Sequence, residues 1–496
     1  MRPLSPLFAA PWNVRLLLAI GVLLHLALGA AMGLSVDEAH YALYALHPAL
    51  SYFDHPPLVG WVQWPLVMLD APTALLRGLP ALLWLGTAMV ARNIAMQLAR
   101  GVDAQRAGLW AVVALFLAPL LHVLGIGLLP DTLLMFFGIL LMRQTLQMTD
   151  AKTSPSLAQW LLLGVWLGLA GLSKYTAIFI ALSVAACLLW THGLRLSRMP
   201  GAWVALVIAM VMVLPVAIWN QQNHWISFTY QAQHGAGSAW RPGNVLQFLA
   251  LQAVVFGPLL WWGWRAVKDA GAGRQLLLFF AIPFATLTVL SGGGSSLPHW
   301  TAPAWVALSP FAGIALARAT QGRVRWGVRM VLALQALVCT ILLSLMVSGG
   351  GALIAAFPKL AEGPNPFADL HGWDAAGARA KELVAQERLE SVGVQNWTLA
   401  SRLGWYARPL PVHVLEDRFD QFDFWAGDLS AGSDTLLVDW SQMAYALPLG
   451  AHGFASCQLL DTLSVTHWGY NLSTFHFYAC RGWAGDPQPR LKGVGE

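Results

Sequence analysis

Residues 14–61 read VRLLLAIGVLLHLALGAAMGLSVDEAHYALYALHPALSYFDHPPLVGW, and this stretch decides how the rest of the chain is interpreted. An apolar run of membrane-spanning length is followed at once by the acidic pair Asp37 and Glu38. A segment rich in aromatic, acidic and proline residues follows at 52–57. Ionised carboxylates beside hydrocarbon are costly unless they are paired, hydrated or used in chemistry. We therefore expect this loop to contain part of a functional site.

The composition is that of a membrane protein. Of the 496 residues, 57% are hydrophobic and only 11% are charged, and the mean hydropathy is +0.58. Apolar runs long enough to span a bilayer recur as far as about residue 350. About eleven spans are expected, near residues 14–33, 73–91, 107–123, 131–148, 158–171, 173–191, 202–220, 245–264, 275–291, 300–317 and 329–349.

Lysine and arginine residues set the expected orientation. They gather in alternate connections, such as 92–106 and 318–329, whereas the connections 35–71 and 122–131 contain none. The positive-inside rule therefore places the N-terminus in the cytoplasm and the first loop and C-terminal part in the periplasm of a bacterial inner membrane. The net charge of +5 reflects this topology and does not indicate nucleic-acid binding, because the bases are spread over many loops.

A change in composition near residue 350 predicts two domains. Residues 1–350 are expected to form a transmembrane domain, and residues 351–496, which contain 16 of the 24 acidic residues, a small periplasmic α/β domain. Helices are expected there at about 375–390 and 397–407, and strands at about 391–395, 412–415, 435–439, 456–463 and 474–480. Cys457 and Cys480 fall in this domain, where an oxidising periplasm permits a disulfide but does not require one.

Four acidic residues form a constellation on the expected outer face, namely Asp37, Glu38, Asp54 and Asp131. No base neighbours them in the sequence, so their partners must come from elsewhere in the fold or from a metal ion. A carboxylate in such a place can act as general base on an acceptor hydroxyl, while a phosphate leaving group needs a cation or a metal ion. The pattern therefore indicates group transfer at the membrane surface.

Few cations on that face could meet a phosphate. The candidates are Lys174, Arg241 and Arg77. Lys174, in GLSKYTA, can be read as a lysine that snorkels from a helix end, but the positive-inside rule disfavours it there and so favours a phosphate-binding role. Seven histidines share the face: His40, His47, His55, His122, His224, His234 and His299. They could bind a divalent metal with the carboxylates, although the spacing matches no compact metal motif.

The string SVDEAHYALYALHPALSYFDHPPLVGW resembles the first external loop of GT-C glycosyltransferases of family 39, a group that includes lipid A aminoarabinose transferases and protein O-mannosyltransferases. The likeness continues in order through RGLPAL, LLPDTLL, GLSKYTA, WNQQNHWISFTYQAQHG and SLPHWTAPAW. It implies an α-helical polytopic membrane protein whose first 350 residues form the catalytic domain. Asp37 would then be the catalytic carboxylate, supported by Glu38, with Asp131 as a second acid. Lys174 would contact the phosphate of the donor, and Arg241 is a further candidate for that contact.

The aromatic loop departs from the aminoarabinose branch, because residues 54–57 read Asp-His-Pro-Pro rather than Glu-Lys-Pro-Pro. His55 replaces a lysine that contacts phosphate, and it could bind phosphate when protonated or bind a metal itself. In that branch the loop acid and a later histidine hold a metal ion, which implies Asp54 and His234 here. A divalent metal is thus a possible cofactor. Tyr52 and His299 complete the candidate site.

The expected function is an inverting glycosyltransferase that takes a sugar from a polyprenyl-phosphate carrier. The acceptor would be a lipid, a glycan or a protein at the periplasmic face of the membrane. The alternative is a transporter or flippase of a lipid-linked sugar, for which buried mid-span charges and inverted repeats are typical. A third hypothesis is a non-catalytic subunit of envelope assembly. The sequence leaves the sugar and the acceptor open.

Overall fold

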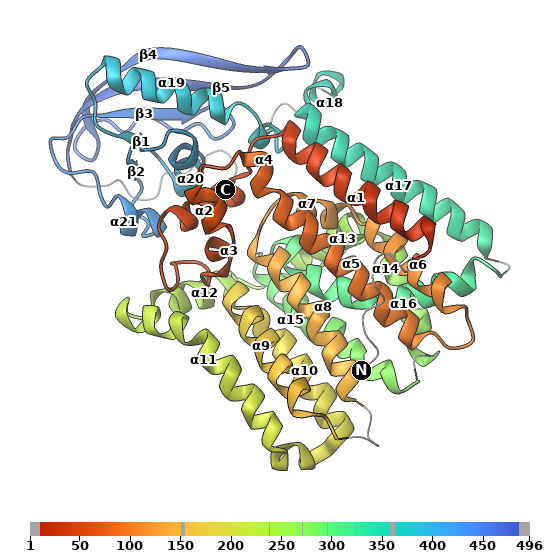
Figure 1. The fold of residues 1–496 in the computed structure, drawn as a ribbon. Helices are drawn as coiled ribbons and strands as arrows, with labels where there is room; N and C mark the ends of the chain where they lie inside the picture. The colour runs from red at the N-terminus through yellow and green to blue at the C-terminus, as the bar shows by residue number, and fades with distance from the viewer. Residues whose placement is uncertain are drawn as a thin grey trace. The chain divides into compact units, whose positions relative to one another are not determined.

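The computed structural model describes residues 10–149, 154–237, 239–269, 271–294, 296–322, 324–357 and 363–485. Its contacts divide the chain into two compact units (Figure 1). The first comprises Met1–Ala27, Ala49–Val62 and Ala74–Ile341, and the second comprises Leu28–Pro48, Gln63–Thr73 and Leu342–Glu496. The second unit thus takes in parts of the first loop, and the domain boundary near residue 350 stays a prediction.

The first unit is built from helices. Its α-helices are α1 (Trp12–Ala31), α3 (Leu58–Met68), α5 (Gly78–Leu98), α6 (Ala104–Phe116), α7 (Pro119–Ile126), α8 (Pro130–Met148), α9 (Leu157–Ser173), α10 (Ala177–His192), α11 (Pro200–Gln222), α12 (Ile226–Ala236), α13 (Pro242–Phe256), α14 (Pro258–Trp261), α15 (Leu278–Leu290), α16 (Ala302–Ala319) and α17 (Arg325–Ser348). Three of these helices, α1, α3 and α17, also contribute residues to the second unit. Short 3-10 turns join them, and one of these, η6 (Pro298–Thr301), leads into α16.

Seven stretches of the described residues are long and apolar enough to cross a membrane, and two bent helix pairs raise the number to nine if each is one span. All eleven expected ranges contain helix, but α8 and α9 are not among the nine, so the count of eleven stays a prediction. The chain is a multi-pass membrane protein with a mostly helical fold.

Helix α16 forms the centre of the first unit. In the apolar stretch Pro298–Ala319, 94% of the most apolar 18 residues are buried, and α16 packs against α5, α6 and α8. Small residues permit this close packing: a Cβ atom at Gly313 would lie 2.4 Å from the carbonyl oxygen of Ala107. A central helix held this closely gives η6, at its N-terminal end, a fixed position.

The two bent pairs share one hydrogen-bonding side chain, that of Gln335 on α17. The bends measure 76° between α6 and α7 and 100° after α13. The Gln335 amide nitrogen donates to the carbonyl oxygens of Leu117 at 2.7 Å and Phe256 at 3.3 Å, and its oxygen accepts from the Leu259 amide at 3.1 Å. Backbone groups freed by a break within a membrane must find partners inside the protein. Gln335 supplies such partners to both breaks.

The second unit contains the expected α/β domain. Five strands, β1 (Val392–Val394), β2 (Val412–Val414), β3 (Thr435–Trp440), β4 (Phe454–His467) and β5 (Tyr470–Trp483), form one sheet in the order β2-β1-β3-β5-β4. The β1 strand pairs in parallel with β2 and β3, whereas β5 is antiparallel to β3 and β4. Cys457 faces Cys480 across β4 and β5, and a disulfide joins them.

Helices pack around this sheet. The second unit contains the helices α2 (Val36–Leu46), α18 (Gly351–Ala356), α19 (Trp373–Gln386), α20 (Trp397–Tyr406) and α21 (Gln421–Trp425), with the 3-10 turn η8 (Ala368–Leu370), and of these α18, α19, α20 and α21 contact strands. Figure 1 shows α19 lying along the sheet, and α19 contacts β3. The α2 helix, which contains Asp37 and Glu38, packs against α20. The acidic pair therefore belongs to the same compact unit as the C-terminal sheet.

Candidate functional site

Asp131 and Lys174 form a buried ion pair in the first unit, although 43 positions separate them. Lys174 Nζ lies 2.8 Å from Asp131 Oδ1 and 2.6 Å from Oδ2, and the two residues are 4% and 1% exposed. Asp131 sits in the first turn of α8, where the helix dipole favours a carboxylate. Lys174 is the extended residue that ends α9. The partner that Asp131 requires is thus supplied from elsewhere in the fold.

The short turn η6 completes this cluster with two neighbouring side chains. His299 Nε2 lies 3.6 Å from Asp131 Oδ2, and Lys174 Nζ lies 5.2 Å from the centre of the Trp300 ring. One turn thus presents an imidazole to the carboxylate and an aromatic face to the ammonium group. Trp300 is not among the residues predicted from the sequence, and its place beside His299 is the signal that could have identified it.

A buried glutamine on α13 holds η6 in place. Gln252 Oε1 accepts from Thr301 Oγ1 at 2.5 Å and from Trp305 Nε1 at 2.7 Å, and its Nε2 donates to the carbonyl oxygen of Pro298 at 3.2 Å. These bonds attach both ends of η6 and the first turn of α16 to one side chain. Gln252 therefore fixes the backbone that carries His299.

The loop containing Tyr52 and Asp54 is held by α12. The Ser227 hydroxyl lies 2.6 Å and 2.7 Å from the carbonyl oxygens of Tyr52 and Phe53, and Gln231 Nε2 donates to that of Asp54 at 2.5 Å. Tyr52 itself is 1% exposed.

His55, in the same turn, contributes to the electrostatic field at Asp131. The structure therefore brings Asp131, Lys174, His299 and His55 into one electrostatic cluster.

The structure does not test whether Asp54 and His234, the two predicted metal ligands, bind one metal ion. His234 lies on α12, but its side chain is outside the described part of the chain. Among the residues that the structure describes, no group of three His, Cys, Asp or Glu could hold a metal ion. Metal binding by Asp54 and His234 stays a prediction.

The two remaining candidate cations, Arg241 and Arg77, differ in exposure. Arg241 precedes α13 with an exposed side chain, and its amide donates to the carbonyl oxygen of Gly292 at 2.8 Å. Arg77 precedes α5 and is 2% exposed. Phosphate binding by Arg241 stays a prediction.

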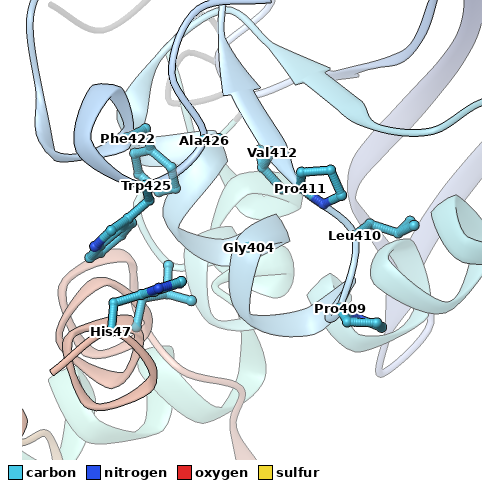
Figure 2. Close-up of a pocket in the computed structure, with 10 residues that line it drawn as sticks. His47, Gly404, Pro409, Leu410, Pro411, Val412, Phe422, Trp425 and Ala426 are labelled. Carbon is cyan, nitrogen blue, oxygen red and sulfur yellow. The ribbon is translucent and has the colours of Figure 1, made fainter.

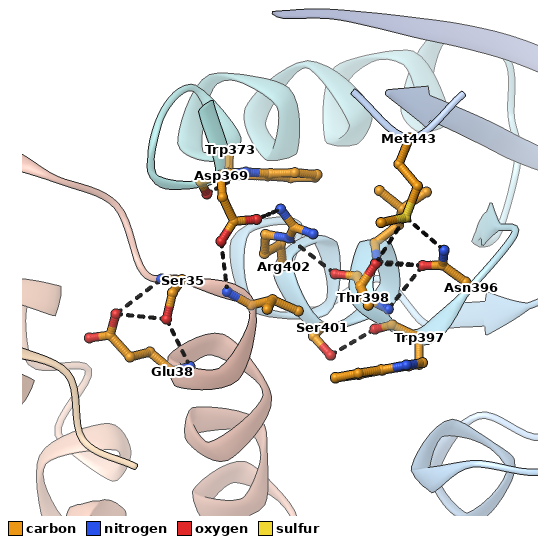
Figure 3. Close-up of polar contacts among 12 residues, drawn as sticks. Ser35, Glu38, Asp369, Trp373, Asn396, Trp397, Thr398, Ser401, Arg402 and Met443 are labelled. Carbon is orange, nitrogen blue, oxygen red and sulfur yellow. Dashed lines mark hydrogen bonds and ion pairs between the residues drawn. The ribbon is translucent and has the colours of Figure 1, made fainter. Parts of the chain in front are cut away.

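Asp37 and Glu38 occupy the first turn of α2 in the second unit. Ser35 caps this helix: its hydroxyl oxygen accepts from the Glu38 amide at 3.4 Å, and Glu38 Oε2 accepts from the Ser35 amide at 3.0 Å (Figure 3). This reciprocal pair is a capping box, and its S-x-x-E pattern is visible in the sequence. Glu38 thus has a structural role at the start of the helix that carries Asp37.

Arg402 on α20 lies beside this turn, within the same unit. It forms an ion pair with Asp369, whose other oxygen accepts from the Val36 amide at 3.4 Å (Figure 3). Burial lowers the pKa of the Arg402 guanidinium group, and the carboxylates of Asp369 and Asp37 oppose that shift. No sequence pattern singles out Arg402, because charged residues are ordinary in a polar domain.

A separate pocket of about 220 Å³ also lies in the second unit (Figure 2). It is lined by Leu43, His47, Gly404, Pro409, Leu410, Pro411, Val412, Phe422, Trp425 and Ala426. The His47 and Trp425 rings stack with their centres 4.9 Å apart. Of the candidate residues identified from the sequence, His47 lines this pocket, as one of the seven histidines considered for metal binding.

Comparison with known proteins shows what the chain is similar to. The family model for dolichyl-phosphate-mannose-protein mannosyltransferases matches residues 54–219, which include Asp131 and Lys174. A lipid A galacturonosyltransferase, RgtD of Rhizobium johnstonii, is 26% identical over 283 residues, which cover 55% of this chain and 58% of that protein. The lipopolysaccharide core galacturonosyltransferase RgtA of the same organism is 25% identical over 321 residues, covering 58% and 61%. The chain thus matches about three fifths of the length of these curated relatives.

Solved structures show the fold. ArnT from Cupriavidus metallidurans bound to undecaprenyl phosphate has a TM-score of 0.62 at 17% identity, covering 94% of this chain and 97% of that one. The apo state of the same protein has a TM-score of 0.60 at 19% identity, covering 86% and 92%. The fold is therefore ArnT-like. The chain resembles GT-C superfamily glycosyltransferases, and ArnT in particular, as the sequence predicts.

Proposed function

We propose that this chain is an inverting glycosyltransferase that moves a sugar from a polyprenyl-phosphate carrier to a lipid A or lipopolysaccharide acceptor. The ArnT-like fold supports the carrier, because the structure with the higher TM-score is of ArnT bound to undecaprenyl phosphate. The acceptor class is supported by the two relatives, which are named as galacturonosyltransferases of lipid A and of the lipopolysaccharide core. A glycan or protein acceptor is the other possibility that the test below distinguishes.

The observation that carries this proposal is the buried cluster around Lys174. A lysine ammonium group has three N–H donors, and two of them are directed to Asp131. The third can meet a phosphate oxygen. A lipid-linked sugar phosphodiester carries one negative charge. When the lipid phosphate leaves, it carries two negative charges, because the electron pair of the broken bond stays on its oxygen. A fixed cation beside that oxygen stabilises the transition state more than the ground state.

The proposed reaction forms one bond and breaks one. The acceptor hydroxyl oxygen attacks the anomeric carbon from the side opposite the phosphate, and the bond between that carbon and the phosphate oxygen breaks. The electron pair of the broken bond stays on the lipid phosphate. Asp37 accepts the hydroxyl proton as general base. Lys174 faces the new charge, and His299 or His55 can donate a further hydrogen bond to it when protonated.

The decisive test combines purified protein with a deletion strain. Protein in lipid nanodiscs receives polyprenyl-phosphate sugar and either lipid A, lipopolysaccharide core, glycan or peptide acceptors, and products are weighed by mass spectrometry. We expect one sugar to be added to the lipid acceptors, with Asp37→Asn and Lys174→Ala reducing the rate at least 100-fold. Envelope lipids of the deletion strain should lack that mass, and an Asp37→Ala gene should not restore it. Flux of the carrier across proteoliposomes without bond formation would instead support a transporter.

We also propose a periplasmic location for the second unit, with the N-terminus in the cytoplasm of the inner membrane. The distribution of lysine and arginine supports this topology. The Cys457–Cys480 disulfide fits an oxidising compartment. Alkaline phosphatase fused after residue 485 should be active, and a fusion in the loop near residue 195 should be inactive. The reverse pattern contradicts the proposed orientation.

A further inference from the structure

We propose that Arg402 is a positioning residue that fixes the first turn of α2 and keeps the carboxylate of Asp37 ionised for catalysis. The inference rests on the proposed function, because it takes Asp37 as the general base. It concerns contacts within the second unit only, between the segment before α2 and residues of η8 and α20.

Arg402 is an unusual residue for the interior of a small domain. It is 1% exposed, and its guanidinium carbon lies 4.1 Å from the centre of the Trp373 ring and 5.0 Å from that of Trp440. Its Nε donates to the carbonyl oxygen of Thr398 at 3.1 Å. Withdrawing a charge from water is so costly that apolar replacement of a buried ion pair is often neutral or stabilising. Stability alone therefore does not explain a buried charge here.

The ion pair continues into the start of α2. Asp369 binds Arg402 through one oxygen and accepts from the Val36 amide through the other, at 3.4 Å. The amide of Val36 belongs to the first turn, whose N–H groups have no partner within the helix. The Arg402–Asp369 pair thus acts as a cap supplied by the C-terminal part of the unit, in addition to the Ser35–Glu38 box.

Two more bonds hold the same short segment. The Leu34 amide donates to the Tyr406 hydroxyl at 2.7 Å, and the Gly33 amide donates to the carbonyl oxygen of Leu370 at 2.9 Å. A Cβ atom at Gly33 would lie 3.1 Å from both acceptor oxygens, so a larger residue would push this contact apart. Residues 33–36 are therefore attached at three successive points to η8 and α20, and Asp37 follows directly.

The charges around Asp37 give Arg402 its second role. Glu38 lies in the same turn, and Asp369 faces that turn from η8. From α20 come Arg402 and the neutral Tyr406 hydroxyl, while His40, one turn along α2, hydrogen-bonds Ser401. Two further carboxylates near Asp37 disfavour its ionised form, and the guanidinium group opposes them. Without Arg402, Asp37 would keep its proton to a higher pH and could not act as base.

Three substitutions separate geometry from charge. Arg402→Met removes the charge and retains a long apolar side chain between the tryptophans. Arg402→Lys retains the charge but lacks the planar fork that binds a carboxylate through two donors. Asp369→Asn weakens the cap on Val36 while leaving Arg402 present. The matched control is Arg408→Met, which also removes an arginine stacked on a tryptophan, 3.7 Å from the centre of the Trp405 ring.

The test measures amide hydrogen exchange at residues 33–38 and steady-state kinetics of the full chain in nanodiscs. For Arg402→Met we expect faster exchange, kcat lowered at least tenfold with donor KM changed less than twofold, and an acidic limb of the pH profile raised by about 1 pH unit or more. Arg402→Lys should keep the acidic limb of the wild type and lose kcat. Arg408→Met should match the wild type in both measurements.

Two results overturn the inference. One is exchange at residues 33–38 that stays like the wild type in both Arg402→Met and Asp369→Asn. The other is a fall in kcat for Arg402→Met with no movement of the acidic limb, which a packing defect alone would produce. If the wild type transfers no sugar, the proposed function fails, whereas the exchange measurement still decides whether Arg402 fixes the turn. If Arg402→Met does not fold, Arg402→Gln, which also removes the charge but keeps polar donors, is measured in its place with the same expected shift of the acidic limb.

Discussion

Lys174 directs two of its three ammonium hydrogens to the two carboxylate oxygens of Asp131, at 2.8 Å and 2.6 Å. The positive charge of Lys174 and the negative charge of Asp131 compensate each other, so neither buried charge lacks a partner. A ligand phosphate would meet a lysine that is already oriented by a carboxylate and by the face of Trp300.

The first prediction concerns breaking this pair. Lys174→Met or Asp131→Asn should each lower the free energy of unfolding by about 3–5 kcal/mol, because one buried charge remains without its partner. The double variant should recover most of the stability but none of the glycosyl transfer. Thermal unfolding in detergent and the transfer assay measure the two properties separately. Transfer by the double variant at the rate of the wild type would exclude Lys174 from phosphate binding.

The second prediction concerns Gln252, which holds the turn carrying His299. Gln252→Leu leaves the Trp305 indole N–H without its acceptor, at a cost of about 1–3 kcal/mol, whereas the Thr301 hydroxyl keeps the carbonyl oxygen of Pro298, 3.1 Å away. We expect kcat to fall at least tenfold, because small displacements of catalytic groups slow reactions strongly.

The control for Gln252 is Gln275→Leu, which removes another buried glutamine of the first unit, bonded to Thr191 at 3.0 Å. It should lose stability without a comparable loss of kcat. An equal fall of kcat in both variants would show that the effect is a general one of buried glutamines.

The third prediction concerns the pH dependence of stability. Burial raises the pKa of Asp420 to about 7 and that of Asp439 to about 6. A folded carboxyl that holds its proton above its unfolded pKa is most favourable at low pH, and its stabilising effect is lost as pH rises from about 4 through 7. Asp420→Asn retains an acceptor for the Phe422 amide, bonded at 2.7 Å, and cannot ionise.

We therefore expect Asp420→Asn to stabilise the protein at pH 8 by up to about 4 kcal/mol relative to the wild type. Little difference is expected at pH 4, where both side chains are neutral, so the low-pH measurement is the internal control. Chemical unfolding monitored by tryptophan fluorescence at the two pH values gives the comparison. A stabilisation that is equal at both values would point to hydrogen bonding rather than ionisation.

The fourth prediction concerns the disulfide between β4 and β5. Replacing both Cys457 and Cys480 by serine should lower the unfolding free energy by about 2–4 kcal/mol, because the unfolded chain is no longer closed by the bond. Reducing agent should have the same effect on the wild type and none on the variant. A wild-type protein that resists reduction and unfolds at the same temperature as the variant contradicts the prediction.

The candidate site shows what the sequence can reveal. Asp131 and Lys174 could be identified because a charge within an apolar run is rare and expensive. Their pairing could not be predicted, because it depends on how α8 and α9 pack and their positions are 43 apart. The capping role of Glu38 could be predicted from the S-x-x-E pattern of Ser35 and Glu38.

The fold was predictable to a similar degree. Apolar runs located helices in all eleven expected ranges, and alternation located the five strands of the C-terminal sheet. The affiliation of α2 with that sheet was not predictable, because it depends on long-range contacts such as that between Val36 and Asp369. Arg402 escaped notice for the same reason, since only tertiary burial distinguishes it from other charged residues of the polar domain.

The hydrogen bonding of two distant helix breaks depends on one side chain, that of Gln335. One amide group serves the α6–α7 break through Leu117 and the α13–α14 break through Phe256 and Leu259. Removing that amide would withdraw hydrogen-bonding partners from both breaks at once, and the interior of a membrane offers no water to replace them. A substitution at position 335 must therefore be accommodated at both breaks.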